Sequence, residues 1–163
     1  MSPATVRVAS RSDIPDVERL LSELDRHHVD LLPHIFHAPD GPVRPTGILT
    51  AAIDDDDQDI LVAEADGRVV GVAQVKVAKR PESAIFRPRD YAVLENMIVD
   101  ASHRGAGAGT ALFEAVKSWS RERALTHVQT ICWAANEGAL AFYQKAGFEA
   151  VTMRLECPVS PSS

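Results

Sequence analysis

The segment with the clearest chemical potential is a glycine-rich turn between a strand-like run and an amphipathic stretch. It consists of Arg104, Gly105, Ala106, Gly107, Ala108, Gly109 and Thr110. Glycines at alternate positions let the main chain approach a ligand closely and turn its N–H groups toward it. A helix that begins here adds unpaired N–H groups and the positive end of its dipole, and Arg104 adds a permanent cation. This combination is typical of a phosphate or pyrophosphate site.

Two common nucleotide motifs do not describe this turn. A P-loop has a Lys directly after its last glycine, and no Lys follows these glycines. A dinucleotide fingerprint has a third glycine where this chain has Thr110 or Leu112. By itself the turn therefore indicates a site for some phosphate or, equally, a flexible surface turn made of small residues.

Length and composition predict one globular domain. The 163 residues are 45% apolar and 25% charged, so we expect a single domain over residues 1–163 with a frayed end at 158–163. No apolar run is long enough to cross a membrane and no secretory leader is evident, so we expect a cytoplasmic protein without a membrane partner. The net charge of −6 argues against a nucleic-acid partner. Cys132 and Cys157 match no metal or redox spacing and are expected to be reduced thiols.

Hydrophobic periodicity predicts a mixed α/β (α+β) fold. A middle group of three strands should form an antiparallel meander, with a hairpin turn at Asp66-Gly67. The strand–helix–strand unit around residues 107–119 implies a parallel portion. The expected strands are residues 5–9, 60–64, 69–77, 91–99, 127–133 and 148–155, and the expected helices are 13–27, 48–53, one beginning near 107, and 137–145.

A second signature follows the glycine-rich turn, separated from it by one helix and one strand. It starts at Asn136, continues with the aromatic pair Phe142-Tyr143, and ends at Gly147-Phe148. With the turn, it resembles the GNAT superfamily of N-acetyltransferases, whose phosphate loop R/Q-x-x-G-x-G/A is matched by Arg104, Gly107 and Gly109. The resemblance covers residues 60–155 and fits the first helix. Residues 28–58, which help shape the acceptor site in that family, match least.

The resemblance implies a mixed, mostly antiparallel central sheet that is splayed in the middle and flanked by helices. Acetyl-CoA would lie in the gap as co-substrate, without a metal. The pantetheine arm would pair with the main chain of Met97, Ile98 and Val99, the pyrophosphate would bind Arg104–Thr110, and Asn136, primarily a helix N-cap, would also contact the cofactor. The expected partners are acetyl-CoA, a primary amine of a small molecule or protein, and a second copy in a homodimer.

Glu95 and Tyr143 are the candidate catalytic residues. Glu95 shares a strand face with Val93, Met97 and Val99, where a charge is costly unless it is paired or faces a cavity. A partly desolvated Glu has a raised pKa and suits a general base, whereas the alternative is an ion pair with Arg or Lys at the sheet surface. The resemblance implies a base at Glu95 and a Tyr143 that protonates the departing thiolate.

Three further expectations concern residues outside these roles. Cys132 is expected to pack in the core rather than act as a nucleophile. His27, His28, His34 and His37 are expected to be surface or acceptor-pocket residues rather than metal ligands, because their spacing matches no ligand pattern. The alternative function is a non-catalytic acyl-CoA sensor or interaction module with the same fold.

Overall fold

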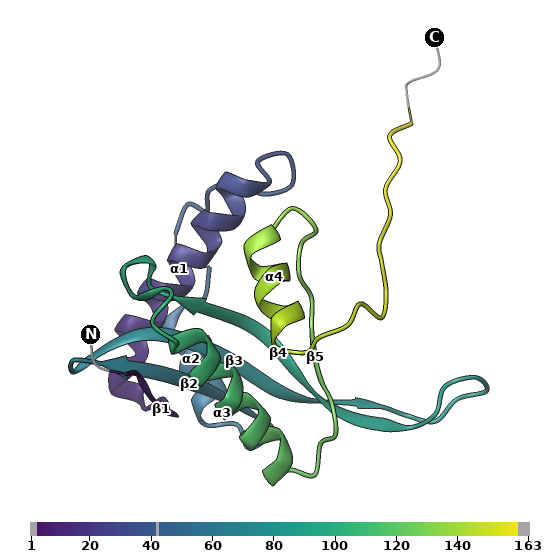
Figure 1. Cartoon of the computed structure of the whole chain (residues 1–163), viewed down its shortest axis with the longest axis horizontal. Coiled ribbons are helices and arrows are strands. Elements are labelled where there is room, and N and C mark those ends of the chain that lie inside the picture. The colour runs from purple at the N-terminus through teal and green to yellow at the C-terminus, as the bar shows by residue number, and fades with distance from the viewer. Residues whose placement is uncertain (1–2, 42, 160–163) are drawn as a thin grey trace. The chain divides into compact units, whose positions relative to one another are not determined.

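The computed structural model describes residues 3–41 and 43–159. Its residues group into two compact units, 1–131 and 132–163, and each unit is described by itself. The prediction of a single domain therefore stays a prediction. Figure 1 shows the elements of both units.

The first unit is built on a five-stranded sheet in the order β1-β2-β3-β4-β5. The first four strands pair antiparallel, and β5 pairs parallel with β4. The β2–β3 turn has left-handed main chain at Asp66 and Gly67, as a tight hairpin requires. The mixed, mostly antiparallel sheet is the predicted one. The strands are β1 Thr5–Val8, β2 Gln58–Ala65, β3 Arg68–Arg80, β4 Arg89–Val99 and β5 Val128–Thr130.

Helices cover both faces of this sheet. Ile60 to Ala63 are all buried, and because successive residues of a strand point to opposite faces, neither face is open there. On one face, Val62, Val72 and Ile98 pack with α1 and α2. On the other, a Cβ at Gly71 would lie 3.0 Å from Leu112 of α3, so glycine permits this close approach. The helices are α1 Ile14–Leu31, α2 Thr46–Ile53 and α3 Ala108–Glu122.

The second unit contains α4, which spans Glu137–Lys145 as predicted. The Asn136 side chain accepts a hydrogen bond from Ala139 N–H at 3.1 Å, and Gly147 follows the helix with left-handed main chain. Both predicted caps are confirmed.

Two predicted strands need correction. Residues 148–155 form no strand, because none of them has a ladder partner among the described residues. The strand predicted for 127–133 shortens to Val128–Thr130, where β4 provides the only paired edge. Alternating apolar residues therefore identified extended chain, but hydrogen bonding to a neighbour decides whether it is a strand.

Candidate functional site

The glycine-rich turn leads directly into α3. Gly105 and Gly107 both have left-handed main chain, with φ of 77° and 88°, and a Cβ at either would meet no atom within 4 Å. The first hydrogen bond entering the helix runs from Ala111 N–H to Gly107 O at 2.9 Å. The N–H groups of Ala108, Gly109 and Thr110 therefore lie before it, at the positive end of the helix dipole. This geometry suits an anion.

Arg104 is attached to the end of the preceding strand. Its Nε donates to Val99 O at 3.0 Å, and its Nη2 lies 3.6 Å from Glu23 Oε1 on α1. About half of the Arg104 side chain remains exposed. The cation is thus held beside the helix N-terminus with donors left over, although a bound phosphate would compete with Glu23 for it.

Asp100 anchors the chain between β4 and the turn. Its carboxylate accepts hydrogen bonds from Ser102 Oγ at 2.6 Å and Ser102 N–H at 3.0 Å, and Arg19 Nη1 lies 3.2 Å away. These hydrogen bonds, helped by Arg19, lower the pKa of Asp100 to about 2. Its main-chain N–H donates to Val70 O at 2.8 Å, which fixes the end of β4 to β3.

Asp100→Asn should lower the free energy of unfolding at neutral pH by about 1–2 kcal/mol, because the ionised carboxylate binds Ser102 and Arg19 more strongly than an amide does. The folded pKa lies below the unfolded one, so the wild-type advantage is present above about pH 4 and is lost as the pH falls toward 2. Urea unfolding of both proteins across this range measures it. A difference that does not change with pH would contradict this origin.

A β-bulge at Glu95 changes which main-chain groups face the open edge of β4. Opposite β3, Leu94 pairs with Val75 but Asn96 pairs with Gln74, so Glu95 is the extra residue. Before the bulge, Ala92 N–H donates to His127 O on the β5 side. β5 pairs with β4 only from Ala92 to Leu94, so beyond the bulge this edge of β4 meets no strand of the described chain.

Beyond the bulge, odd-numbered residues rather than even-numbered ones direct their main-chain N–H and C=O groups away from β3. Asp100 N–H points to β3, so Ile98 also faces β3, and Met97 and Val99 face the open edge. Met97 and Val99 therefore offer main-chain donors and acceptors there, apart from the Val99 carbonyl bound by Arg104. The main chain of Ile98 was expected to be open to a pantetheine arm, like that of Met97 and Val99. In the structure the Ile98 side chain is buried and its main chain is directed to β3.

Glu95 forms an ion pair with Lys76 on β3. The expectation of a partly desolvated carboxylate is wrong for this structure, since Glu95 is exposed. The bulge explains this, because it displaces Glu95 from the ladder and so from the alternation that would place it among Val93 and Met97. The ion-pair alternative is what the structure shows.

In the second unit, Tyr143 lies among aromatic rings. Its ring centroid lies 5.5 Å from that of Phe142 and 5.1 Å from that of Phe148, both in edge-to-face contact. Cys132 is half-buried rather than in the core, and burial raises the pKa of its thiol. A raised pKa disfavours the thiolate, in line with the prediction that Cys132 is not a nucleophile.

The histidine-rich segment lies at the end of α1 and after it. The His28 ring stacks on Phe36 at 5.5 Å, and burial, followed by the neighbouring His27, lowers the pKa of His28. Within residues 3–41 and 43–159, no three or more His, Cys, Asp or Glu side chains gather as a metal site. The segment therefore supplies packing through the stacked rings of His28 and Phe36.

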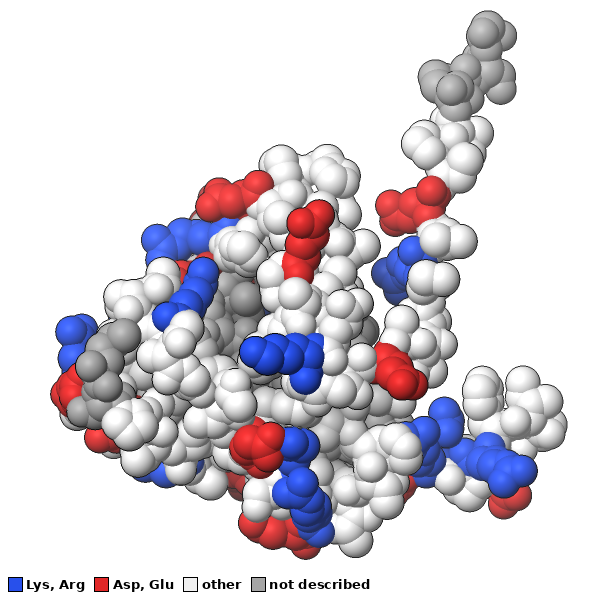
Figure 2. Space-filling model, in the orientation of Figure 1, with Lys and Arg blue, Asp and Glu red and all other residues white. Residues whose placement is uncertain are grey.

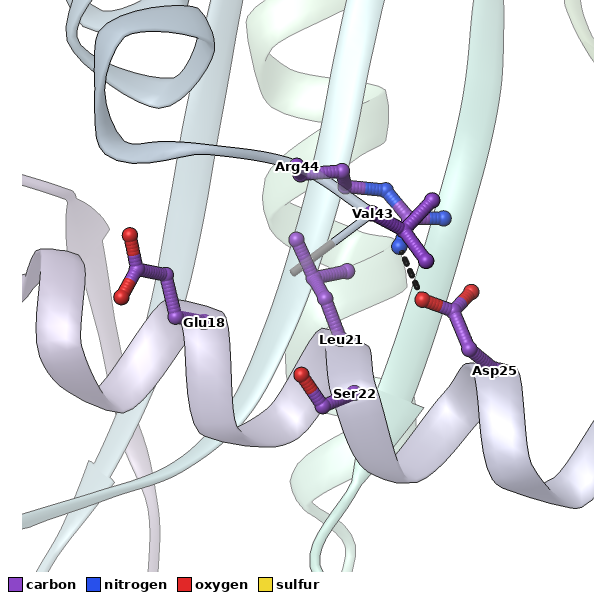
Figure 3. A pocket seen from close by; sticks show the side chains of 6 residues that line it. All are labelled: Glu18, Leu21, Ser22, Asp25, Val43 and Arg44. Atoms are coloured by element: carbon purple, nitrogen blue, oxygen red, sulfur yellow. Dashed lines mark hydrogen bonds and ion pairs between the residues drawn. The ribbon is translucent and has the colours of Figure 1, made fainter. Parts of the chain in front are cut away.

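A small hollow lies between α1 and the chain before α2 (Figure 3). Arg44 Nη1 crosses it to Asp25 Oδ2 at 2.6 Å. Its volume of about 10 Å³ is the room of roughly one water molecule, so it does not hold an acceptor. The lining residues are Glu18, Leu21, Ser22, Asp25, Val43 and Arg44.

Sequence reasoning missed two residues near the site. Asp100 follows a strand and precedes Ser102, which is an Asx-turn pattern that could have identified it. No sequence pattern identifies Lys76 as the partner of Glu95, because their pairing depends on the register of β3 against β4 and on the bulge. No helix within the described ranges is both long and apolar enough to span a membrane.

The chain is similar in sequence to known N-acetyltransferases. The chain is 33% identical over 155 residues to glucosamine 6-phosphate N-acetyltransferase of Trypanosoma brucei brucei, covering 85% of this chain and 93% of that one. It is 31% identical over 88 residues to rat N-acetyltransferase 8, where the match covers 54% of this chain and only 38% of the relative.

Solved structures share the fold at low sequence identity. The F44R mutant of the BH1408 protein from Bacillus halodurans aligns with a TM-score of 0.89 and 22% identity, over 94% of this chain and 98% of that one. The aminoglycoside 6'-N-acetyltransferase AAC(6')-Ih of Acinetobacter baumannii aligns with a TM-score of 0.74 and 17% identity, over 98% and 99%.

The family model described as Acetyltransferase (GNAT) family matches residues 22–148, which include the glycine-rich turn, β4 and α4. Since this match extends over most of the chain, the protein belongs to the GNAT acetyltransferase family.

Proposed function

We propose that this chain transfers an acetyl group from acetyl-CoA to a primary amine. The observation that carries the proposal is the continuity of two main-chain surfaces. The open edge of β4 at Met97 and Val99 runs into the exposed N-terminus of α3 through a turn tied to β4 by Arg104 and Asp100. A long ligand with an amide-containing arm and a pyrophosphate matches both surfaces.

In this proposal the main chain does most of the binding. Met97 and Val99 bind the pantetheine arm, and Ile98 sets the spacing between them. Arg104 and the N–H groups of the turn through Thr110 bind the pyrophosphate, with Gly105 and Gly107 leaving room for it. Asn136 is proposed to contact the same ligand with groups that its cap does not use.

The chemistry needs a proton acceptor for the amine and a proton donor for the departing thiolate. Glu95 is proposed as the acceptor, directly or through water, and it forms an ion pair with Lys76. Tyr143 is proposed as the donor. Cys132 has no part, because direct attack by the amine needs no covalent intermediate.

Glu95→Gln should lower kcat about tenfold to a hundredfold, because the amide cannot accept the amine proton. An exposed ion pair contributes about 0–1 kcal/mol, so the melting temperature should hardly change. Steady-state kinetics and thermal melts separate the two roles, with Lys76→Met as the control that breaks the same pair. If Glu95→Gln and Lys76→Met behave alike in both measurements, Glu95 is a structural partner of Lys76 and not the base.

The acceptor is proposed to be a primary amine of a small molecule or a protein. The T. brucei relative is named for glucosamine 6-phosphate, so this amino sugar belongs among the candidates. The chain is acidic, with a net charge of −6, which favours cationic acceptors in the encounter. Amino sugars with and without phosphate, polyamines, aminoglycosides and peptide N-termini therefore form the test set.

Release of free thiol from acetyl-CoA, scanned over this amine set, tests the function. We expect release that depends on one amine class, together with acetyl-CoA binding by calorimetry. An absence of acetyl-CoA binding would refute the proposal. Tight binding without turnover over the whole set would favour the non-catalytic acyl-CoA sensor instead.

The proposed location is the cytoplasm. Cys132 and Cys157 are free thiols in the structure, which suits a reducing compartment. The proposed working form is a homodimer.

A further inference from the structure

Helix α1 contacts the short segment between β4 and the glycine-rich turn at both of its ends. Arg19 Nη1 lies 3.2 Å from Asp100 Oδ2, where β4 finishes. Glu23 Oε1 lies 3.6 Å from Arg104 Nη2, where the turn begins. Arg19 and Glu23 are four positions apart in the helix, so they lie on the same face of it. One face of α1 therefore holds this segment by two ion pairs of opposite polarity.

The two ion pairs differ in how firmly they are made. Asp100 also accepts hydrogen bonds from Ser102 Oγ at 2.6 Å and Ser102 N–H at 3.0 Å, so the Arg19 end is fixed by several contacts. The contact between Glu23 and Arg104 is 3.6 Å long, which is beyond hydrogen-bond distance. The Glu23 pair is therefore the one that can be exchanged for another partner.

Arg104 can leave Glu23 and still stay at the site. Its Nε donates to Val99 O at 3.0 Å, and 53% of its side chain is exposed. A guanidinium anchored through Nε keeps the N–H donors of both Nη atoms for an anion. A pyrophosphate at the N-terminus of α3 would thus bind Arg104 at hydrogen-bond distance and take it from Glu23, because one half-exposed cation does not satisfy two anions equally.

Most ion pairs on this surface contact no proposed ligand site. In Figure 2, red and blue residues lie side by side over α3, where Lys117 pairs with Glu114. The pair of Glu23 and Arg104 differs from these because Arg104 is itself the cation of the proposed pyrophosphate site. Making or breaking this one pair therefore has a consequence for ligand binding.

We propose that Glu23 competes with the pyrophosphate of CoA for Arg104, and that it thereby weakens CoA binding and shortens the time that CoA stays bound. This inference rests on the proposed function, since it requires a pyrophosphate at Arg104–Thr110. Binding exchanges the Glu23 carboxylate for phosphate, so the measured affinity is reduced by the fraction of molecules in which Glu23 holds Arg104. When CoA leaves, Glu23 takes Arg104 back.

Calorimetric titration with CoA tests the inference. Glu23→Gln should lower the dissociation constant about threefold to fivefold, because the amide no longer competes for Arg104. Dissociation measured by stopped flow should slow by a similar factor. Glu18→Gln is the matched control, because it removes the same charge from α1 but its carboxylate accepts from Thr46 Oγ1 at 2.7 Å. Its CoA affinity should equal that of the wild type.

The same titration in an Arg104→Met background identifies the cause. CoA should bind Arg104→Met more weakly than the wild type, and adding Glu23→Gln should then bring no further gain, because there is no guanidinium left to release. A gain that persists without Arg104 would mean repulsion at a distance, and it would overturn the inference. So would a Glu23→Gln variant that binds CoA no more tightly than the wild type, since loss of a merely structural contact does not tighten binding. If neither the wild type nor any variant binds CoA, the proposed function itself fails, and the inference with it.

Discussion

Tyr143→Phe should lower kcat for acetyl transfer about a hundredfold while changing the Michaelis constant for acetyl-CoA little. The substitution removes only the hydroxyl, so the proposed general acid for the departing thiolate is lost, and an acid of this kind contributes about 10²–10⁴-fold. The edge-to-face contacts with Phe142 and Phe148 involve the ring, which Phe retains. The packing of the residue 143 ring against Phe142 and Phe148 should therefore be retained in the variant.

Tyr91→Phe is the matched control, because it deletes the same atom from the chain's other tyrosine, on β4. We expect its kcat to stay near the wild-type value. Pre-steady-state measurement of thiol release identifies the step that slows. If Tyr143→Phe weakens acetyl-CoA binding and leaves kcat alone, Tyr143 is a binding or packing residue and its proposed role is wrong.

Gly107→Ala should raise the dissociation constant for acetyl-CoA about tenfold to a hundredfold. The added Cβ points into space that is open within 4 Å, which is the space the proposed pyrophosphate would use. The residue also has φ of 88°, so a side chain introduces main-chain strain of about 1–2 kcal/mol. Affinity and stability therefore both fall, and a control must separate them.

Gly67→Ala supplies that control. Gly67 has φ of 73° in the β2–β3 turn, and a Cβ there also meets no atom within 4 Å. Its strain should match that of Gly107→Ala, while calorimetric affinity for acetyl-CoA should be unchanged. Equal losses of affinity in both variants, or none in Gly107→Ala, would refute the assignment of the turn to the pyrophosphate.

The sequence predicted the elements well where local chemistry decides them. Three such features are the N-cap at Asn136, the left-handed glycines and the apolar face of α1. Each depends only on residues a few positions apart, so the sequence is enough to predict it. The glycine-rich turn belongs to this class, since its open space follows from Gly105 and Gly107 alone.

Features that depend on pairing could not be predicted. The bulge at Glu95 is set by how two long strands align, and no residue type marks it. Consequently the sequence did not predict that Glu95 is exposed or that it pairs with Lys76. It also did not predict that the main chain of Ile98 is directed to β3. The strand predicted for residues 148–155 is wrong for the same reason. Alternation of apolar and polar residues indicates which face a side chain would occupy, but it does not indicate whether a neighbouring strand is present.

The bulge has a consequence for how this protein can change. A single extra residue both releases Glu95 from the ladder and turns Met97 and Val99 toward the open edge. If Glu95 instead took the place opposite Gln74 and the bulge closed, every main-chain direction from Asn96 to Asp100 would reverse. The position of the proposed base and the proposed surface for the cofactor arm are therefore set together by one bulge, and they keep their places only while Glu95 stays outside the ladder.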